Sequence, residues 1–93
     1  MLSDFRIFET DQFREDLRNV FGAGEDKIVA KLGKFVYPQL RQQPYFGKNI
    51  KKLKGYAPET WRYRIRDYRF FYEIDDKRRT VFMIAAGHRA KGY

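Results

Sequence analysis

The sequence predicts an α+β domain: a small antiparallel β-sheet with two N-terminal helices packed on one face, in the order βααβββ. Two stretches in the first half of the chain carry apolar residues at helical spacing. Three stretches in the second half alternate apolar and polar residues, as half-buried strands do. Short loops join these strands, which favours antiparallel pairing. With 93 residues, we expect a single domain over positions 1–93.

The first half begins with a short strand. Residues Phe5 to Glu9 alternate apolar and polar side chains, and Thr10 or Asp11 can cap the helix that follows. Apolar residues then recur at helical spacing until residues 22–24, whose sequence Gly-Ala-Gly predicts the end of this helix.

A second helix is predicted to begin near Glu25 and Asp26, because carboxylates suit the positive end of the helix dipole. Its apolar stripe continues to Leu40, but Pro38 cannot donate a backbone hydrogen bond. We therefore expect a kink or an end near residues 35–37. Residues 45–60 contain no periodic pattern and are predicted to be irregular.

Three consecutive strands are predicted in the second half, at about Trp61 to Ile65, Tyr68 to Ile74 and Thr80 to Ala86. Side chains in a strand point alternately to opposite faces. The predicted core face carries Trp61, Tyr63, Ile65, Phe70, Tyr72 and Ile74. The other face carries Arg62, Arg64, Arg69, Phe71 and Glu73. Arg66 falls in the turn, where we expect it to point into solvent.

The charge is unevenly distributed along the chain. Residues 1–30 contain four Lys/Arg and seven Asp/Glu, whereas residues 31–93 contain sixteen and five, within a total net charge of +8. This basic region suits a nucleic acid, an acidic protein or an anionic membrane. A membrane suits it least, because the cations lie on predicted strands and loops instead of an amphipathic helix. A basic surface without a specific partner is the remaining alternative.

The sequence lacks the residues that several classes of chemistry require. There is no Cys, no Gly-rich phosphate or dinucleotide motif, and one His without metal-ligand spacing. We therefore expect no metal, no small-molecule cofactor and no membrane insertion. The absence of cysteine, of a signal sequence and of a long apolar segment suits the cytoplasm.

The remaining Arg, Lys, Tyr and His side chains suit metal-free cleavage of RNA. In that reaction the 2′-hydroxyl attacks phosphorus, and guanidinium groups stabilise the charge that grows on the phosphate oxygens. Arg62 and Arg64 are a candidate phosphate clamp, or else a solvated strand face that discourages edge pairing. Arg69 is a candidate contact to the scissile phosphate, or else an ion-pair partner of Glu73.

The other candidates have simpler alternatives too. His88 and Arg89 follow the last predicted strand, but a lone His is more often structural than catalytic. Tyr93 is a proton donor or stacking ring, or else part of a frayed terminus. Phe71 is a candidate for base stacking because it shares the arginine face. Backbone-binding cations are expected at Lys51, Lys52 and Lys54.

These residues resemble the RelE/ParE toxin superfamily of type II toxin–antitoxin systems, and its RelE-like branch fits best. The resemblance covers residues 50–93 and rests on five segments in order. They are Leu53 to Gly55, Trp61 to Ile65, Asp67 to Arg69, Tyr72 to Asp75, and Gly87 to Arg89 with Tyr93. The turn position held by Gly in the family is Arg66 here, and a tight hairpin turn requires a positive φ at that position.

The resemblance implies a metal-independent endoribonuclease that cleaves messenger RNA on the ribosome and is silenced by a cognate antitoxin. By position, it implies roles for Arg62 and Arg64 on the first hairpin strand, and for Arg69 on the next. Arg89 and Tyr93 match the residues after the final strand, and His88 lies where some members have His and others Lys. The superfamily also includes ParE-like gyrase poisons, and a non-catalytic RNA-binding relative is a third alternative.

Overall fold

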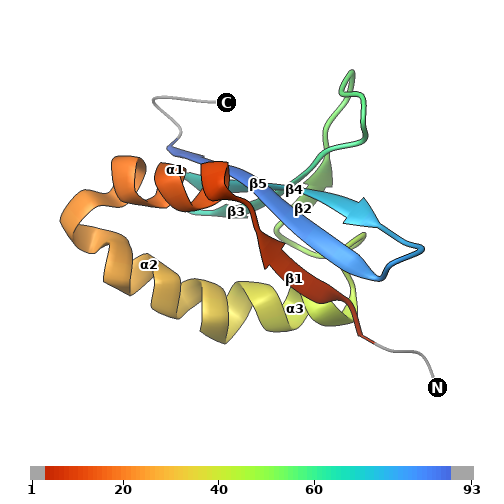
Figure 1. Cartoon of the computed structure of the whole chain (residues 1–93), viewed down its shortest axis with the longest axis horizontal. Coiled ribbons are helices and arrows are strands. Elements are labelled where there is room, and N and C mark those ends of the chain that lie inside the picture. The colour runs from red at the N-terminus through yellow and green to blue at the C-terminus, as the bar shows by residue number, and fades with distance from the viewer. Residues whose placement is uncertain (1–3, 89–93) are drawn as a thin grey trace.

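The computed structural model describes residues 4–88, which form a mixed sheet and a helical layer (Figure 1). The sheet order is β1-β5-β4-β3-β2. The strands are β1 (Arg6–Glu9), β2 (Ile50–Lys52), β3 (Trp61–Ile65), β4 (Tyr68–Asp75) and β5 (Thr80–His88). The helices are α1 (Asp11–Phe21), α2 (Glu25–Lys31) and α3 (Tyr37–Gln42), linked by the 3₁₀ turn η1 (Gly22–Gly24) and the π-helical turn η2 (Leu32–Val36). The predicted α+β class is confirmed.

Two details of the predicted sheet are wrong. The sheet is not wholly antiparallel, because β1 runs parallel to β5, with Ile7 opposite Val81. The helices return the chain across the sheet before β2 begins, so the first and last strands become neighbours in the same direction (Figure 1). Residues 45–60 are also not wholly irregular, since β2 pairs antiparallel with β3 inside this segment. Three residues are too few to show an alternating pattern.

Helix α1 continues where β1 stops and completes the edge of β5. The Thr10 hydroxyl caps the helix by accepting a hydrogen bond from the Phe13 N–H at 3.2 Å. The same hydroxyl donates to the Met83 carbonyl at 2.8 Å. One turn later, the Asp16 carboxylate accepts from the Ala86 N–H at 3.0 Å. These contacts give hydrogen-bond partners to backbone groups of β5 beyond the last residue of β1. They also hold the helix against the sheet.

The second helical segment does not end at Pro38. It widens into the π-helical turn η2, where the Tyr37 N–H donates to the Leu32 carbonyl five residues earlier. The helix then resumes as α3, with Pro38 in its first turn. The position of the predicted irregularity is thus confirmed. Its form is a π-bulge, which allows the apolar stripe to continue to Leu40.

One apolar cluster lies between the helices and the sheet. Tyr72, Phe70 and Phe13 are among its fully buried side chains. The Tyr72 hydroxyl donates to the Pro44 carbonyl at 2.7 Å, and the Tyr37 hydroxyl donates to the Glu9 carboxylate. Among the described residues, no helix is long and apolar enough to cross a bilayer.

A β-bulge changes the face on which the end of β5 lies. Phe71 pairs with Ala85 but Tyr72 pairs with Met83, so Ile84 is an extra residue on β5. Before the bulge Val81 and Met83 face the helices, and after it Ala86 does. Strand β5 also continues to His88, two residues beyond its predicted end.

The two buried tyrosines predict a loss of stability at alkaline pH. Burial, and then the Glu9 carboxylate, raise the pKa of Tyr37 above its ordinary value of 10.0. Burial also raises the pKa of Tyr72. The unfolded chain therefore loses protons above about pH 10 while the folded chain keeps them, and the free energy of unfolding falls by up to about 1.4 kcal/mol per pH unit for each tyrosine.

Denaturant titrations between about pH 8 and about pH 11 measure this fall. A Tyr37→Phe/Tyr72→Phe variant has no phenol at either site, so most of the slope is expected to disappear even if the variant is less stable at neutral pH. An unchanged slope in the double variant would show that other groups cause the alkaline loss.

Candidate nucleic-acid interface

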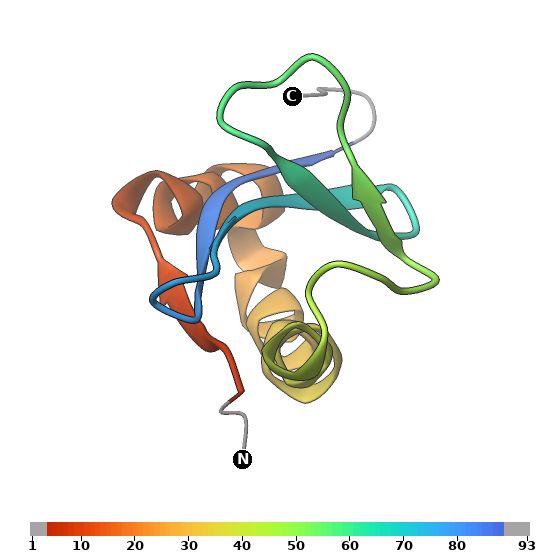
Figure 2. The ribbon, with the colours of Figure 1, turned by 90° about the vertical axis from the view of Figure 1, so that its right-hand side faces the viewer.

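Strand register brings four cations together on the sheet face that points away from the helices. We call this set the cationic face: Lys51, Arg62, Arg64 and Arg69. Lys51 of β2 lies directly opposite Arg62 of β3, and Arg64 lies directly opposite Arg69 of β4. Figure 2 shows these three strands side by side on the side of the molecule remote from α2. Directly opposed cations destabilise a sheet unless an anion lies between them.

Arg62 is a partly buried member of the cationic face. Its Nε–H is buried and has no hydrogen-bond partner within the described residues 4–88. Burial first, and then the charges of Arg64 and Arg69, lower the pKa of Arg62 below its ordinary value. Arg is effectively always protonated in proteins, so the side chain keeps its charge at a cost in stability. A site with an unused donor and an excess of positive charge suits an anionic group.

No counter-ion belonging to the described chain balances this charge. Among residues 4–88, the ion pairs involve other cations, and Arg62, Arg64 and Arg69 form none. The alternative in which Arg69 pairs with Glu73 is therefore not observed. The alternative of edge protection also does not apply. Strand β2 pairs with β3 at Arg62, and the Arg64 N–H donates to the Asn49 carbonyl just before β2.

The turn after β3 restrains one arginine. The Arg64 Nε–H donates to the carbonyl of Arg66 at 2.8 Å, which leaves its terminal nitrogens for a ligand. Arg66 adopts a φ of +52°, as the hairpin turn requires. The Asn49 carbonyl accepts a hydrogen bond from the Arg64 N–H at 3.0 Å. The sequence did not predict this role for Asn49, because Asn49 reaches Arg64 only through the three-residue strand β2, which was not predicted either.

The structure separates the three predicted lysines. Lys51 belongs to the cationic face, but Lys52 points to the opposite side. Its Nζ lies 2.9 Å from a Glu59 carboxylate oxygen and 5.8 Å from the centre of the Trp61 ring. Lys54 is exposed in a turn that ends at Gly55. Only Lys51 therefore has a place beside the arginines by strand register.

Two of the other candidates do not fit their predicted roles. Phe71 shares the cationic face but its side chain is only 3% exposed, so its ring is not available for base stacking. The bulge in β5 turns His88 to the helix side, where its ring centroid lies 5.0 Å from that of Tyr68. His88 is therefore not brought to the cationic face. Arg89 and Tyr93 lie outside the described residues.

Nothing in the described part of the chain resembles a metal site. No group of three or more His, Asp or Glu side chains that could hold an ion occurs between residues 4 and 88. The cationic face offers guanidinium and ammonium groups, which bind phosphate oxygens.

The family model for the ParE toxin of type II toxin–antitoxin systems, parDE, matches residues 7–93. The chain belongs to this family. It is the toxin of a type II toxin–antitoxin system, and the predicted RelE/ParE superfamily is confirmed. No curated protein sequence matches it significantly.

Solved structures of toxin–antitoxin complexes are similar to this ParE-family toxin. RelBE2 from Mycobacterium tuberculosis has 26% identity and a TM-score of 0.75, with 98% of each chain covered. The RelE–RelB complex from Pyrococcus horikoshii has 19% identity and a TM-score of 0.66, with 92% of this chain and 96% of that chain covered. The RelBE complex from E. coli has 21% identity and a TM-score of 0.61, covering 90% and 95%. The last two support the fold alone.

If the cationic face is a binding site without its ligand, removing a charge from it should stabilise the toxin. Arg62→Met keeps an unbranched side chain but removes the repulsion from Arg64 and Arg69. We expect the free energy of unfolding to rise on the order of 0.5–1 kcal/mol at low salt. The gain should shrink as salt screens the charges.

Urea denaturation at low and high salt tests this expectation. Arg14→Met is the matched control, because the Arg14 Nε lies 3.4 Å from a Glu9 carboxylate oxygen and its loss removes an attraction. If Arg62→Met lowered the free energy of unfolding at low salt by as much as the control does, the expectation would be contradicted.

Proposed function

We propose that this toxin is a metal-independent endoribonuclease that cleaves messenger RNA, with the ribosome presenting the substrate. The observation that carries the proposal is the cationic face: Arg62, Arg64 and Arg69 converge without a counter-ion among residues 4–88. A surface that is electrostatically unfavourable in the free protein becomes favourable when phosphates occupy it. RNA backbone meets this requirement directly.

The proposed reaction is attack of the 2′-hydroxyl on the adjacent phosphorus, with departure of the 5′ oxygen. Arg64 and Arg69 would bind the non-bridging oxygens, where negative charge grows in the transition state. Arg62 would use its unpaired Nε–H for a neighbouring phosphate. Arg is a poor base, so proton transfer requires other groups. We propose that solvent water takes the proton of the 2′-hydroxyl, that Tyr93 donates a proton to the departing 5′ oxygen, and that Arg89 is a charge partner.

The geometry also supports a requirement for the ribosome. Arg64 is exposed, and the candidate stacking ring Phe71 is buried. The arginines would then bind the phosphates of free RNA, but little on this face would orient the bases. A ribosome that holds the message in place would supply that orientation, so the isolated toxin should cleave free RNA poorly.

The proposed partner in the resting cell is a cognate antitoxin. The similar toxins from M. tuberculosis, P. horikoshii and E. coli were all solved in complexes with their antitoxins. An acidic or amphipathic antitoxin segment over the cationic face would replace the missing counter-ions and exclude RNA at the same time.

The second candidate is a gyrase poison, and the ParE family model favours it. Such a toxin would act through a protein surface and would not need arginines that converge on one phosphate. A non-catalytic RNA-binding protein is the third candidate. The convergence of the arginines favours RNA chemistry over both.

Induced expression with transcript mapping tests the proposal. We expect cuts within translated messages, and Arg64→Ala or Arg69→Ala should each reduce cleavage by about 100-fold or more, because each removes a donor to the transition state. Arg18→Ala is the control, since Arg18 is an exposed cation on α1. Circular dichroism establishes that the variants fold.

The outcomes separate the three candidates. Intact transcripts with relaxed or broken DNA would establish the gyrase alternative. Intact transcripts and intact DNA, with RNA bound by the wild type and released by Arg69→Ala, would establish the non-catalytic alternative. Full toxicity of both arginine variants would also overturn the proposal.

A further inference from the structure

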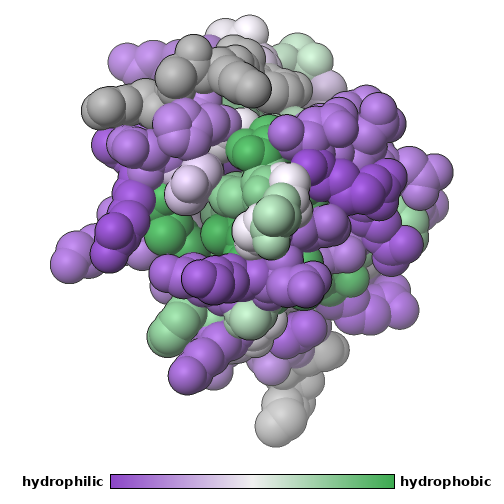
Figure 3. Space-filling model, turned by 90° about the vertical axis from the view of Figure 1, so that its left-hand side faces the viewer, coloured by the Kyte–Doolittle hydropathy of each residue, from purple (hydrophilic) through white to green (hydrophobic). Residues whose placement is uncertain are grey.

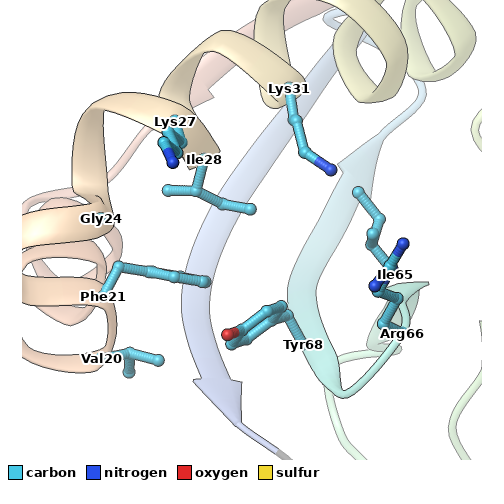
Figure 4. Close-up of a pocket in the computed structure, with 9 residues that line it drawn as sticks. All are labelled: Val20, Phe21, Gly24, Lys27, Ile28, Lys31, Ile65, Arg66 and Tyr68. Atoms are coloured by element: carbon cyan, nitrogen blue, oxygen red, sulfur yellow. The ribbon is translucent and has the colours of Figure 1, made fainter.

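A second candidate site lies on the helix side of the sheet. A pocket of about 250 Å³ opens between the end of α1, the helix α2 and the β3–β4 turn (Figure 4). Its apolar surface comes from Val20, Phe21, Ile28, Ile65 and Tyr68. Figure 3 views the molecule from this end and shows apolar surface near the centre, surrounded by hydrophilic side chains.

Three cations surround the opening of this pocket. Lys27 and Lys31 come from one side, one helical turn apart on α2, and Arg66 comes from the opposite side (Figure 4). All three side chains are exposed, and within residues 4–88 none of them forms an ion pair. None of the described residues that line the pocket carries a carboxylate. The rim therefore lacks the negative charge that would complement it.

Arg66 is a strained residue at the rim of this pocket, and a surface hollow without a function would not require one. Its φ of +52° lies in the left-handed region, where a residue with a Cβ atom is strained relative to ordinary backbone. Glycine adopts that conformation at lower cost, so a hairpin turn alone does not call for arginine. Strained non-glycine residues gather at functional sites. The strained residue here contributes a cation to the rim.

We propose that this pocket binds an acidic peptide segment of a partner protein, with one large apolar side chain inserted and flanking carboxylates on Lys27, Lys31 and Arg66. The volume is below the range of about 300–1,000 Å³ typical of small-molecule sites, and it suits a single anchor side chain. The apolar lining provides affinity for the anchor, and the rim selects the sign of the flanking charge.

Two other occupants fit less well. A second copy of the toxin would have to insert an exposed aromatic side chain. Phe8 is 54% exposed but packs on Phe82, with ring centroids 5.6 Å apart. The other strongly exposed phenylalanines of the described chain are Phe35 and Phe46, at 56% and 74%. Lys34 and Lys48 lie close to these residues in the chain, so cations would meet cations. RNA would need an open ring to stack on, but the Phe21 and Tyr68 rings pack on each other with centroids 4.6 Å apart.

The pocket and the cationic face lie on opposite sides of the sheet. Ile65 and Tyr68 face the helices, whereas Arg64 and Arg69 face away from them. A peptide in the pocket would therefore leave the cationic face open. The inference does not depend on the reaction proposed for the cationic face, and a binding measurement tests it separately.

Fluorescence anisotropy with a labelled peptide, Glu-Asp-Gly-Phe-Gly-Asp-Glu, tests the proposal on the full chain at low salt. We expect saturable binding that weakens by about tenfold or more when Phe is replaced by Ser in the peptide. The toxin variant Lys27→Glu/Lys31→Glu should weaken binding by about tenfold or more. The variant Lys34→Glu/Lys48→Glu has the same net charge but changes residues outside the pocket, and it should stay within about threefold of the wild type.

Methyl NMR spectra locate the bound peptide. The Ile28 and Ile65 signals should shift, while Ile74, toward the other end of the sheet, should not. Equal losses in the two double variants would overturn the proposal, as would equal binding of the Ser peptide. Displacement of the peptide by a short oligoadenylate through the same two lysines would instead indicate an RNA site. Loss of self-association in the Lys27→Glu/Lys31→Glu variant would indicate a second copy.

Discussion

The two-residue period of the β3–β4 hairpin is the constraint on which the rest of the toxin depends. Tyr63, Phe70 and Tyr72 are buried against the helices, so the residues between them must point the other way. A slip of one residue would bury arginines and expose the core, which makes the register hard to change. The apolar face that stabilises the fold thus also forces Arg62, Arg64 and Arg69 together, despite their mutual repulsion.

A single extra residue in β5 decides which side chains can join that cationic surface. The bulge at Ile84 reverses the alternation, so Ala86 and His88 face the helices and Gly87 lies beside Arg69. Without it, His88 would stand on the arginine side. The bulge coincides with the end of β1, where Thr10 and Asp16 take over the hydrogen bonding of β5. The change of face in β5 and the replacement of β1 by side-chain hydrogen-bond partners therefore occur at the same place along the strand.

The two proposed binding surfaces meet at the β3–β4 turn. The Arg66 carbonyl holds Arg64 on the cationic face, while the Arg66 side chain lines the pocket on the helix side. Within residues 4–88, the cations of both surfaces form no ion pairs, and both surfaces suit acidic or phosphate-bearing partners. They differ in chemistry, since the cationic face offers guanidinium groups for phosphate and the pocket offers an apolar cavity for a side chain. If both proposals hold, this difference would allow RNA and protein to be recognised on separate sides of one sheet.

By itself, the sequence determined the fold class, the strands of the hairpin and the face on which its arginines lie, because these follow from local periodicity. It also predicted a helix cap at Thr10 or Asp11, which the structure shows to be Thr10, and the irregularity near Pro38. Only the tertiary structure decided the parallel β1–β5 pair, the short strand β2, the burial of Phe71 and the side on which His88 lies. These depend on contacts between segments far apart in the chain, and a pattern of neighbouring residues carries no information about them.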